Sequence, residues 1–458
     1  MLYFFFLAFC SICFIIPMKH RSWLLLAANL FFLYSVNAKI SFAFITIALI
    51  NYFLTIKSLT GRKHWYQCLI LINVLFLAAF KYILPAMPDG SLLYYVLPVG
   101  ISLFVFQQIS FVVDRNSQEE LQNISCKDFL IYTFFFIPFS TGPLTRIEQL
   151  YKNKEEQLYF NSQNFIEGCI LFYSGVFKKF VIADNISFLT GTMFNPKISG
   201  IQTGLLIPFL LSKYEIFANF SGFTDMALGM GLILGFKLPQ NFNRPFATTS
   251  IVEFWKRWHM SLSLWIRDYV FYPLSVSKFG RLGAYAILTV TFLIFAAWHD
   301  IKLTYLSYGL IQVILIFLAH KFSKSFKAFN QSINSAILKK IVLLIDWIIF
   351  YSITLSIPGI LFRSTSLGQF TKIMSMVSQS TFKGTLSFVM STGNSLLYVA
   401  AGILLYEIFD YKLGIQNFTN FFQKRSYVQK IIIFYLLIIL VLVFYSDQNN
   451  TGFVYSIF

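Results

Sequence analysis

Long apolar runs follow one another along the whole chain, and they constrain its fold more than any other feature. A membrane helix needs about 20 mostly apolar residues, so a chain of 458 residues that is 57% apolar supplies about eleven spans once polar interruptions are allowed for. A soluble globular protein is excluded. The sequence predicts an all-α polytopic membrane protein that forms one domain over residues 1–458. The runs lie at 2–17, 22–36, 41–56, 66–80, 92–113, 128–140, 166–183, 201–217, 225–236, 283–298, 302–319, 341–362, 395–409 and 431–445.

Several of these runs are too short to cross a membrane upright, and the short ones cluster between residues 92 and 300. Broken helices at membrane depth are tolerated only where they are buried in protein or line a cavity. We therefore expect some of these short runs to be re-entrant segments or half-helices. Pro239 and Pro245, flanked by amide side chains, predict a rigid non-helical turn immediately afterwards.

The net charge of +17 is carried by short basic clusters between the apolar runs. This pattern is typical of topology signals and contacts with membrane lipids, and no nucleic-acid partner is expected. Lys and Arg are concentrated in cytoplasmic loops. The clusters at 19–21, 57–63, 321–340 and 424–430 therefore predict that the N-terminus and the C-terminus both lie outside the cytoplasm.

Two of the five histidines stand apart from the basic ends of the runs. His299 ends the run that begins at Ala284 and precedes Asp300, and an ionisable group in such a place is a functional candidate by default. The alternative is a hydrogen-bonded packing residue. His259 lies in the segment 253–272, where three of the seven tryptophans alternate with charges of both signs. Two interpretations explain this segment equally well: it anchors the chain at the membrane interface, or it forms the wall of a site.

These two histidines do not predict a metal centre, because a catalytic zinc ion usually takes three protein ligands. The sequence also has no G-x-S-x-G elbow to support a serine triad. A histidine that acts as general base on a hydroxyl, with an activated acyl donor, needs neither feature. This chemistry is the enzymatic interpretation that the residues favour.

Seven motif blocks occur in order within residues 95–300. They are 97–102 with Phe106 and Gln107, 138–146, 177–179 with 183–185, 220–227, 241–246, 254–265, and Trp298 with His299. Together they resemble the membrane-bound O-acyltransferase family, and in particular its bacterial branch that acylates alginate, peptidoglycan and teichoic acid. The resemblance implies a ring of tilted helices around a central tunnel in a bacterial inner membrane, with 95–300 as the catalytic core.

The resemblance also implies roles for individual residues. His299 is implied to be the essential histidine and His259 a second catalytic position. Asp300 stands where relatives usually have Gly, and Asn219 where many have Asp. The residues expected around the substrates are Trp298, Asp300, Arg146, Asn241, Asn243, Ser221, Asp225 and Gln107.

The implied reaction needs an acyl thioester donor, either acetyl-CoA or an acyl carrier protein, and no bound cofactor. The predicted function is transfer of an acetyl group across the inner membrane for O-acylation of a cell-envelope polysaccharide. Within the family, D-alanyl transfer to teichoic acid is the alternative. Outside the family, the alternative is a proton-coupled transporter or flippase. It would relay protons through His299, Asp300 and Asp225, although the sequence shows no inverted repeat. A scaffold subunit is the third interpretation.

The C-terminal tail, 446–458, combines a polar linker with an apolar end that contains Phe453, Tyr455 and Phe458. An interfacial aromatic tail would have this composition. The F-x-Y-x-x-F pattern, however, resembles the tail of the bacterial branch, which implies that Tyr455 carries the acyl group as an ester. A phenol is a poor nucleophile at neutral pH, so His299 would have to act as its base. The resemblance further implies a periplasmic serine-hydrolase-type acyltransferase as partner.

Overall fold

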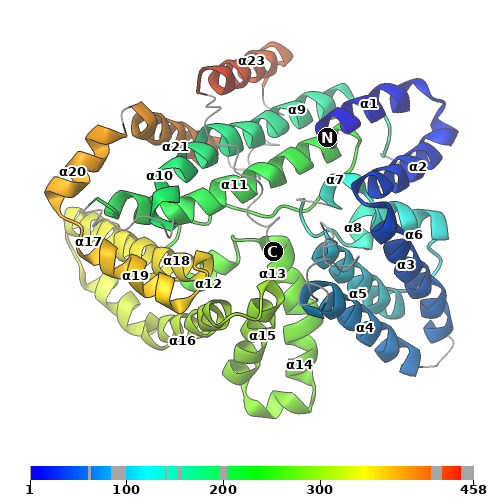
Figure 1. Ribbon diagram of the computed structural model, residues 1–458, viewed down its shortest axis with the longest axis horizontal. Coiled ribbons are helices and arrows are strands. Elements are labelled where there is room, and N and C mark those ends of the chain that lie inside the picture. The colour runs from blue at the N-terminus through cyan, green and yellow to red at the C-terminus, as the bar shows by residue number, and fades with distance from the viewer. Residues whose placement is uncertain are drawn as a thin grey trace. The chain divides into compact units, whose positions relative to one another are not determined.

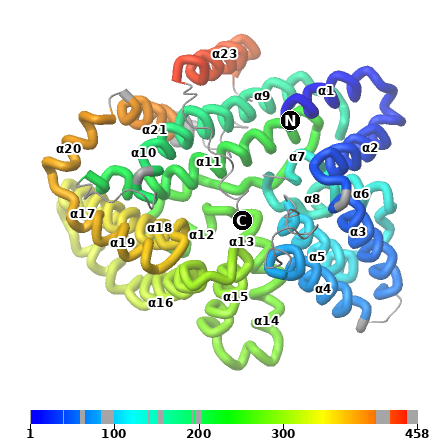
Figure 2. The backbone as a smooth tube through the Cα atoms, in the orientation of Figure 1, coloured from blue at the N-terminus to red at the C-terminus, as the bar shows by residue number. Residues whose placement is uncertain are grey.

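The computed structural model describes residues 2–59, 63–83, 100–139, 142–151, 157–194, 204–392, 394–413 and 425–444. Within these ranges every regular element is a helix (Figures 1 and 2). Packing divides the chain into two compact units. Unit 1 comprises Met1–Phe172 and Thr224–Gln240, and unit 2 comprises Tyr173–Phe223 and Asn241–Phe458.

Unit 1 is built mainly from the N-terminal helices, among which α3, α4 and α5 pack against one another. The helices are α1 (Leu2–Ile15), α2 (Met18–Val36), α3 (Ala38–Leu59), α4 (Lys63–Ala78) with the π-helical η1 (Ala79–Ile83), α5 (Ile101–Ser117), η3 (Glu119–Leu121), α6 (Cys126–Thr133), α7 (Phe136–Phe139), α8 (Ile147–Tyr151) and most of α9 (Ser162–Val176).

A cluster of neutral side chains joins four of these helices, and we call Asn51, Asn73, Gln108 and Thr133 the amide cluster. Asn51 Nδ2 donates to Asn73 Oδ1 at 3.1 Å and to Gln108 Oε1 at 3.2 Å. Asn73 Nδ2 donates back to Asn51 Oδ1 at 2.7 Å, and Gln108 Nε2 donates to Thr133 Oγ1 at 3.2 Å. All four residues are buried. Polar side chains of this kind hold membrane helices together by interhelical hydrogen bonds.

Unit 2 contains the C-terminal half of the chain. Its helices are η5 (Phe177–Ala183), α10 (Asp184–Phe194), α12 (Ile251–Trp255), α13 (Met260–Ile266), η6 (Arg267–Phe271), α14 (Tyr272–Val276), η7 (Lys278–Leu282), α15 (Ala284–His299), α16 (Leu303–Ser332), α17 (Ala336–Ile349), η8 (Phe350–Ser356), α18 (Ile357–Arg363), α19 (Leu367–Ser378), α20 (Phe382–Ser391), α21 (Asn394–Leu413) and α23 (Tyr427–Phe444). The stretches η5, η6 and η8 are π-helical. The neighbours α15 and α16 form a helical hairpin (Figure 1).

The helix α11 (Leu206–Ile233) joins two apolar runs that are separate in the sequence. The runs 201–217 and 225–236 do not form separate half-helices, because a single helix of 28 residues continues through the polar block between them. The block is tolerated at this place because its polar residues Asn219, Ser221, Thr224 and Asp225 are all buried inside the protein. The expected turn around Pro239 and Pro245 is confirmed, because no helix occurs between Ile233 and Ile251.

Six helical stretches in the described residues are long and apolar enough to cross a membrane, or seven if the bent pair Phe382–Ser391 and Ser395–Ile408 is one span. The six are Ile40–Leu59, Trp65–Ile83, Leu206–Ile233, Leu303–Ser332, Ala336–Arg363 and Tyr427–Phe444. Other predicted runs form shorter apolar helices, including α1 and α15. The predicted class, an all-helical multi-pass membrane protein, is therefore confirmed in its general form.

Candidate active site

His299 lies at the last position of α15 and is 2% exposed. Four aromatic side chains surround its imidazole. The ring centroids of Trp298, Phe362 and Phe295 lie 4.3, 4.8 and 4.9 Å from that of His299, and Tyr305 stacks nearly parallel at 6.0 Å. We call these four residues the aromatic box. An ionisable side chain is thus held in an apolar interior within a single unit.

The hairpin of α15 and α16 brings two sides of this box together. A Cβ atom on Gly309 would lie 2.8 Å from the backbone oxygen of Phe292, so only glycine permits the observed approach of the two helices. Tyr305 and Tyr308 of α16 then pack with Ala296 of α15 in one buried cluster, which Phe362 of α18 completes. Helix packing, and not a loop, therefore determines the surroundings of His299.

Asp300 follows directly and is the C-cap of α15. Its Oδ2 atom pairs with Lys302 Nζ at 2.7 Å, and both side chains are partly exposed. The carboxylate is therefore engaged with a neighbouring cation next to the box. Such an exposed pair contributes little to stability, about 0–1 kcal/mol.

His259 belongs to a second buried polar group in unit 2, which we call the Asn241 cluster (Asn241, His259 and Ser261). Asn241 Oδ1 lies 3.1 Å from His259 Nδ1 and accepts a hydrogen bond from Ser261 Oγ at 2.6 Å. It also accepts from the Ser261 backbone N–H at 3.3 Å. All three residues are buried, and the His259 ring packs edge-on against Phe220 at 4.7 Å.

The Asn241 cluster fixes the tautomer of His259. The Ser261 backbone N–H can only donate, so the Asn241 atom that it meets must be the carbonyl oxygen. His259 Nδ1 therefore carries its proton and donates it to the same oxygen. In the neutral ring this leaves Nε2 as an acceptor, which is the state required to receive a hydroxyl proton or hydrogen bond.

The backbone at His259 is unusual as well. Its φ of 46° and ψ of 50° lie in the left-handed region, which a non-glycine residue seldom occupies and which is found more often at functional sites. The conformation is supported on both sides, because Asn243 N donates to Arg257 O at 2.9 Å and Met260 N donates to Asn241 O at 2.8 Å. Burial lowers the pKa of His259 to about 3, so the ring is neutral at pH 7.

The other predicted site residues divide between the units. Unit 2 contains Ser221, whose buried Oγ has no hydrogen-bond partner among the described residues, and Asn243, which is partly buried. Unit 1 contains Gln107 and Asp225, both buried, and Arg146, whose backbone N–H donates to Gln149 Oε1 at 2.9 Å. The predicted acyl carrier Tyr455 lies outside the described residues.

Some contact residues were not predicted from the sequence. Ser261 lies only two positions after His259, yet its bond to Asn241 depends on the left-handed turn. Phe362 lies 63 residues after His299, and no pattern links the two positions. Among the described side chains, no three His, Cys, Asp or Glu residues gather closely enough to hold a metal ion.

The fold and these two sites define a multi-pass membrane protein with two buried histidines, a class suited to acid–base chemistry inside the membrane region. Comparison with known proteins makes this specific. The chain belongs to the membrane-bound O-acyltransferase family, whose model matches residues 2–358, and it is a membrane acyltransferase.

Individual relatives agree with this assignment. The chain is 28% identical to a probable alginate O-acetylase of Pseudomonas syringae pv. tomato, over 74% of this chain and 69% of the relative. It is 27% identical to a peptidoglycan O-acetyltransferase of Helicobacter pylori, over 78% of this chain and 73% of the relative. A teichoic acid D-alanyltransferase of Bacillus subtilis is 29% identical over 49% of this chain and 60% of the relative. The predicted family and enzyme class are confirmed.

Proposed function

We propose that this enzyme accepts an acetyl group from a cytoplasmic thioester and passes it outward for O-acetylation of a cell-envelope polysaccharide. The observation that carries the proposal is the burial of His299 in the aromatic box of an otherwise apolar helix end. Burying an ionisable side chain in a membrane protein is costly, and a residue retained there at that cost is a functional candidate by default. The relatives named for O-acetyl transfer to alginate and peptidoglycan support acetyl as the group and a polysaccharide as the acceptor.

In the proposed reaction, His299 takes the proton of the attacking hydroxyl while the hydroxyl oxygen forms a bond to the carbonyl carbon of the thioester. The carbon–sulfur bond then breaks, and the thiolate leaves and is protonated. A general base of this kind typically contributes a factor of about 100 to 10,000. Transfer from a thioester to an oxygen ester is near-balanced or downhill, so no metal ion or bound cofactor is required. The donor is acetyl-CoA or an acyl carrier protein.

The Asn241 cluster has a supporting part in this proposal. His259 is neutral and its pKa is far below 7, which makes it a weak base but a stable hydrogen-bond acceptor. Asn241 Nδ2 has no hydrogen-bond partner among the described residues, so it is available to donate to a substrate oxygen. We assign both residues to holding the substrate while His299 moves the proton. Four further residues of unit 2 are proposed to contact substrate, namely Trp298, Asp300, Asn243 and Ser221. The corresponding proposal for unit 1 concerns Arg146, Asp225 and Gln107.

The proposed setting is a bacterial inner membrane, with both termini on the outer side. About eleven spans would form a ring around a tunnel, with broken and short helices accounting for the spans beyond the six long ones. Tyr455 would receive the acyl group as an ester, and a periplasmic serine-hydrolase-type acyltransferase would collect it. D-alanyl transfer is the second candidate, supported by the Bacillus subtilis relative.

The test compares envelope polymers from cells that lack the chain with those from cells that carry the parent or His299→Ala. Mass spectrometry should find acetyl esters that depend on the parent chain and are lost with His299→Ala. D-alanyl esters that follow the same pattern would favour the second candidate. Ester content equal to the parent with His299→Ala, at equal chain level, would contradict the proposal.

The tail is tested separately by incubating the purified full chain with labelled acetyl-CoA and digesting it. Label on the C-terminal peptide that is lost in Tyr455→Phe and in His299→Ala is the expected result. Full polymer acetylation by Tyr455→Phe would remove Tyr455 from the mechanism. Polymer acetylation reconstituted from this chain and the donor alone would remove the partner.

A further inference from the structure

A partly buried ion pair in unit 2 lies at the end of α18, the helix that contributes Phe362 to the aromatic box. Arg363 is the last residue of α18, and its Nη1 atom lies 2.5 Å from Glu215 Oε2 of α11. The Glu215 side chain is 4% exposed and that of Arg363 is 19% exposed. Neither the motif blocks nor the proposed chemistry uses this pair.

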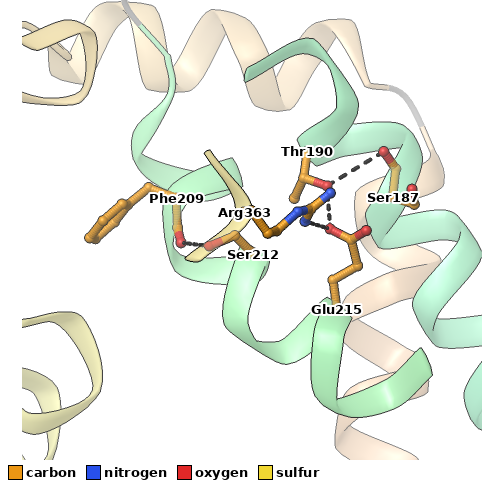
Figure 3. Close-up of polar contacts among 6 residues, drawn as sticks. All are labelled: Ser187, Thr190, Phe209, Ser212, Glu215 and Arg363. Atoms are coloured by element: carbon orange, nitrogen blue, oxygen red, sulfur yellow. Dashed lines mark hydrogen bonds and ion pairs between the residues drawn. The ribbon is translucent and has the colours of Figure 1, made fainter. Parts of the chain in front are cut away.

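Three helices meet at the Glu215 carboxylate (Figure 3). Besides Arg363, it accepts a hydrogen bond from Thr190 Oγ1 of α10 at 2.5 Å. The Arg363 guanidinium also lies over the ring of Phe194, at the end of α10, with its carbon 4.2 Å from the ring centroid. The Arg363 guanidinium thus contacts a carboxylate on one helix and an aromatic face on another. These two contacts restrict the conformation of its side chain.

A second contact between α11 and α18 lies one turn before the ion pair. A Cβ atom on Gly359 would lie 3.3 Å from Cδ of Lys213, so the Lys213 side chain packs against α18 at this glycine. Gly359 and Arg363 are four residues apart and therefore lie on one face of α18. That face of α18 thus contacts side chains of α11 at two successive turns.

Phe362 precedes Arg363 and contacts the imidazole directly. Its ring is nearly perpendicular to that of His299, with the centroids 4.8 Å apart, and it also packs against Tyr305 at 4.9 Å and Tyr308 at 5.1 Å. Because Phe362 and Arg363 are adjacent, we expect a rotation of the end of α18 that releases Arg363 from Glu215 to shift Phe362 relative to His299 as well. The ion pair and the box are therefore mechanically linked through one peptide bond.

We infer that Glu215 and Arg363 are positioning residues for the transfer reaction, which hold Phe362 so that it keeps the His299 imidazole in one orientation. This inference rests on the proposed role of His299 as the base. It predicts that loosening the pair lowers the rate of transfer without weakening binding of the donor, because Glu215 and Arg363 act through Phe362 on the base and not on the thioester.

The experiment uses membrane vesicles that contain the full chain, with labelled acetyl-CoA as donor and the endogenous envelope polymer as acceptor. Glu215→Gln keeps the size and the hydrogen-bond acceptor but removes the charge, and Phe362→Leu removes the ring that contacts His299. Both should lower the maximal rate per chain at least tenfold, with the apparent KM for acetyl-CoA unchanged within twofold. Arg363→Lys, which keeps the charge, should retain more of the rate than Arg363→Met.

Glu407→Gln is the matched control, because Glu407 of the same unit also accepts a hydrogen bond from a hydroxyl, that of Tyr214 at 2.9 Å, but is exposed, whereas Glu215 is buried. It should leave the rate unchanged. Chain level and thermal stability in detergent are measured for every variant. If the rate in Glu215→Gln falls only in proportion to the amount of folded chain, the inference is overturned. A normal rate at a normal chain level would overturn it as well.

Combining variants separates this inference from the proposed function. If Glu215 acts on the rate through Phe362, the Glu215→Gln, Phe362→Leu double variant should be no slower than the slower single variant. If both act through His299, Glu215→Gln should cause no further loss of rate in a His299→Ala background. Normal activity in His299→Ala would remove the proposed function itself. An inactive His299→Ala with fully active Glu215→Gln and Phe362→Leu would leave that function intact and overturn the positioning role.

Discussion

Two kinds of buried polar group can be compared, one from each unit. In unit 1, the amide cluster joins α3, α4, α5 and α6 through neutral side chains that mostly satisfy one another. In unit 2, the groups around the candidate site include ionisable side chains: His259 bonds to Asn241, His299 is enclosed by rings, and Glu215 pairs with Arg363. Neutral, mutually bonded groups connect helices at low cost, whereas buried ionisable groups are expensive and are retained for chemistry. Substitutions in the amide cluster should therefore affect stability, and substitutions of the ionisable groups around the site should affect turnover.

The largest expected effect comes from His299→Ala. It should lower acyl transfer by a factor of about 100 to 10,000 with little change in thermal stability, because a general base is lost from a box that is otherwise apolar. His320→Ala is the control, since His320 is exposed on α16 in the same unit. Transfer is measured per folded chain in membrane vesicles. Activity above about a tenth of the parent would place the base elsewhere.

Asn241→Leu should lower the rate less, by about tenfold or more, because His259 loses the partner that fixes its tautomer while His299 stays in place. Asn241→Asp keeps an oxygen acceptor for His259 Nδ1 and Ser261, and should retain more of the rate. The ratio of the two rates at equal chain level is the measurement. Equal losses in both variants would mean that the amide nitrogen, and not the tautomer, matters.

Acid should destabilise unit 2 through His259. Its pKa is about 3 when buried and 6.5 when exposed, so the unfolded chain binds the extra proton as the pH falls below 6.5. The contribution of neutral His259 to stability is complete above pH 6.5 and is lost progressively as the pH falls toward 3. At pH 5 the loss is roughly 2 kcal/mol. Thermal unfolding in detergent between pH 7 and 5 measures it, and His259→Gln should flatten the dependence.

The smallest effect is expected in unit 1. Asn73→Ala removes one member of the amide cluster and should destabilise the chain by about 1 kcal/mol, the usual size of an interhelical hydrogen bond in a membrane. Turnover per folded chain should stay at the parent level. Thermal unfolding and vesicle activity, measured on one preparation, distinguish the two quantities. A fall in turnover larger than the fall in folded chain would break the proposed contrast between the units.

The sequence predicts the features of this protein that depend on neighbouring residues. The apolar run before His299 indicates a helix that ends at that histidine, and Pro239 with Pro245 indicates the non-helical turn. The continuity of α11 was not predictable, because hydropathy alone does not distinguish polar groups buried in protein from polar groups that end a span. Family resemblance, and not residue spacing, provides the roles expected of His259 and Asn241.

Contacts between distant parts of the chain were also beyond prediction. Glu215 and Arg363 are separated by 148 positions, and Arg363 reads in the sequence as an ordinary cation at the end of a span. Phe362 reads as one more apolar residue in the run 341–362. Glu215, Arg363 and Phe362 are connected to His299 only in the folded chain, where α11 packs against α18 and α18 packs against α16.

The π-helical stretch Phe350–Ser356 has a consequence for insertions and deletions in this chain. A π-helical turn accommodates more residues than an α-helical turn, and each residue of an α-helix turns it by about 100°. Removing one residue from 350–356 would therefore let the stretch close as an ordinary α-helix and leave the phase of α18 nearly unchanged. Inserting a residue elsewhere in the helix would turn α18 by about a quarter of a turn and carry Phe362 and Arg363 away from their partners together. The stretch should thus tolerate the loss of one residue better than the helix around it tolerates the gain of one.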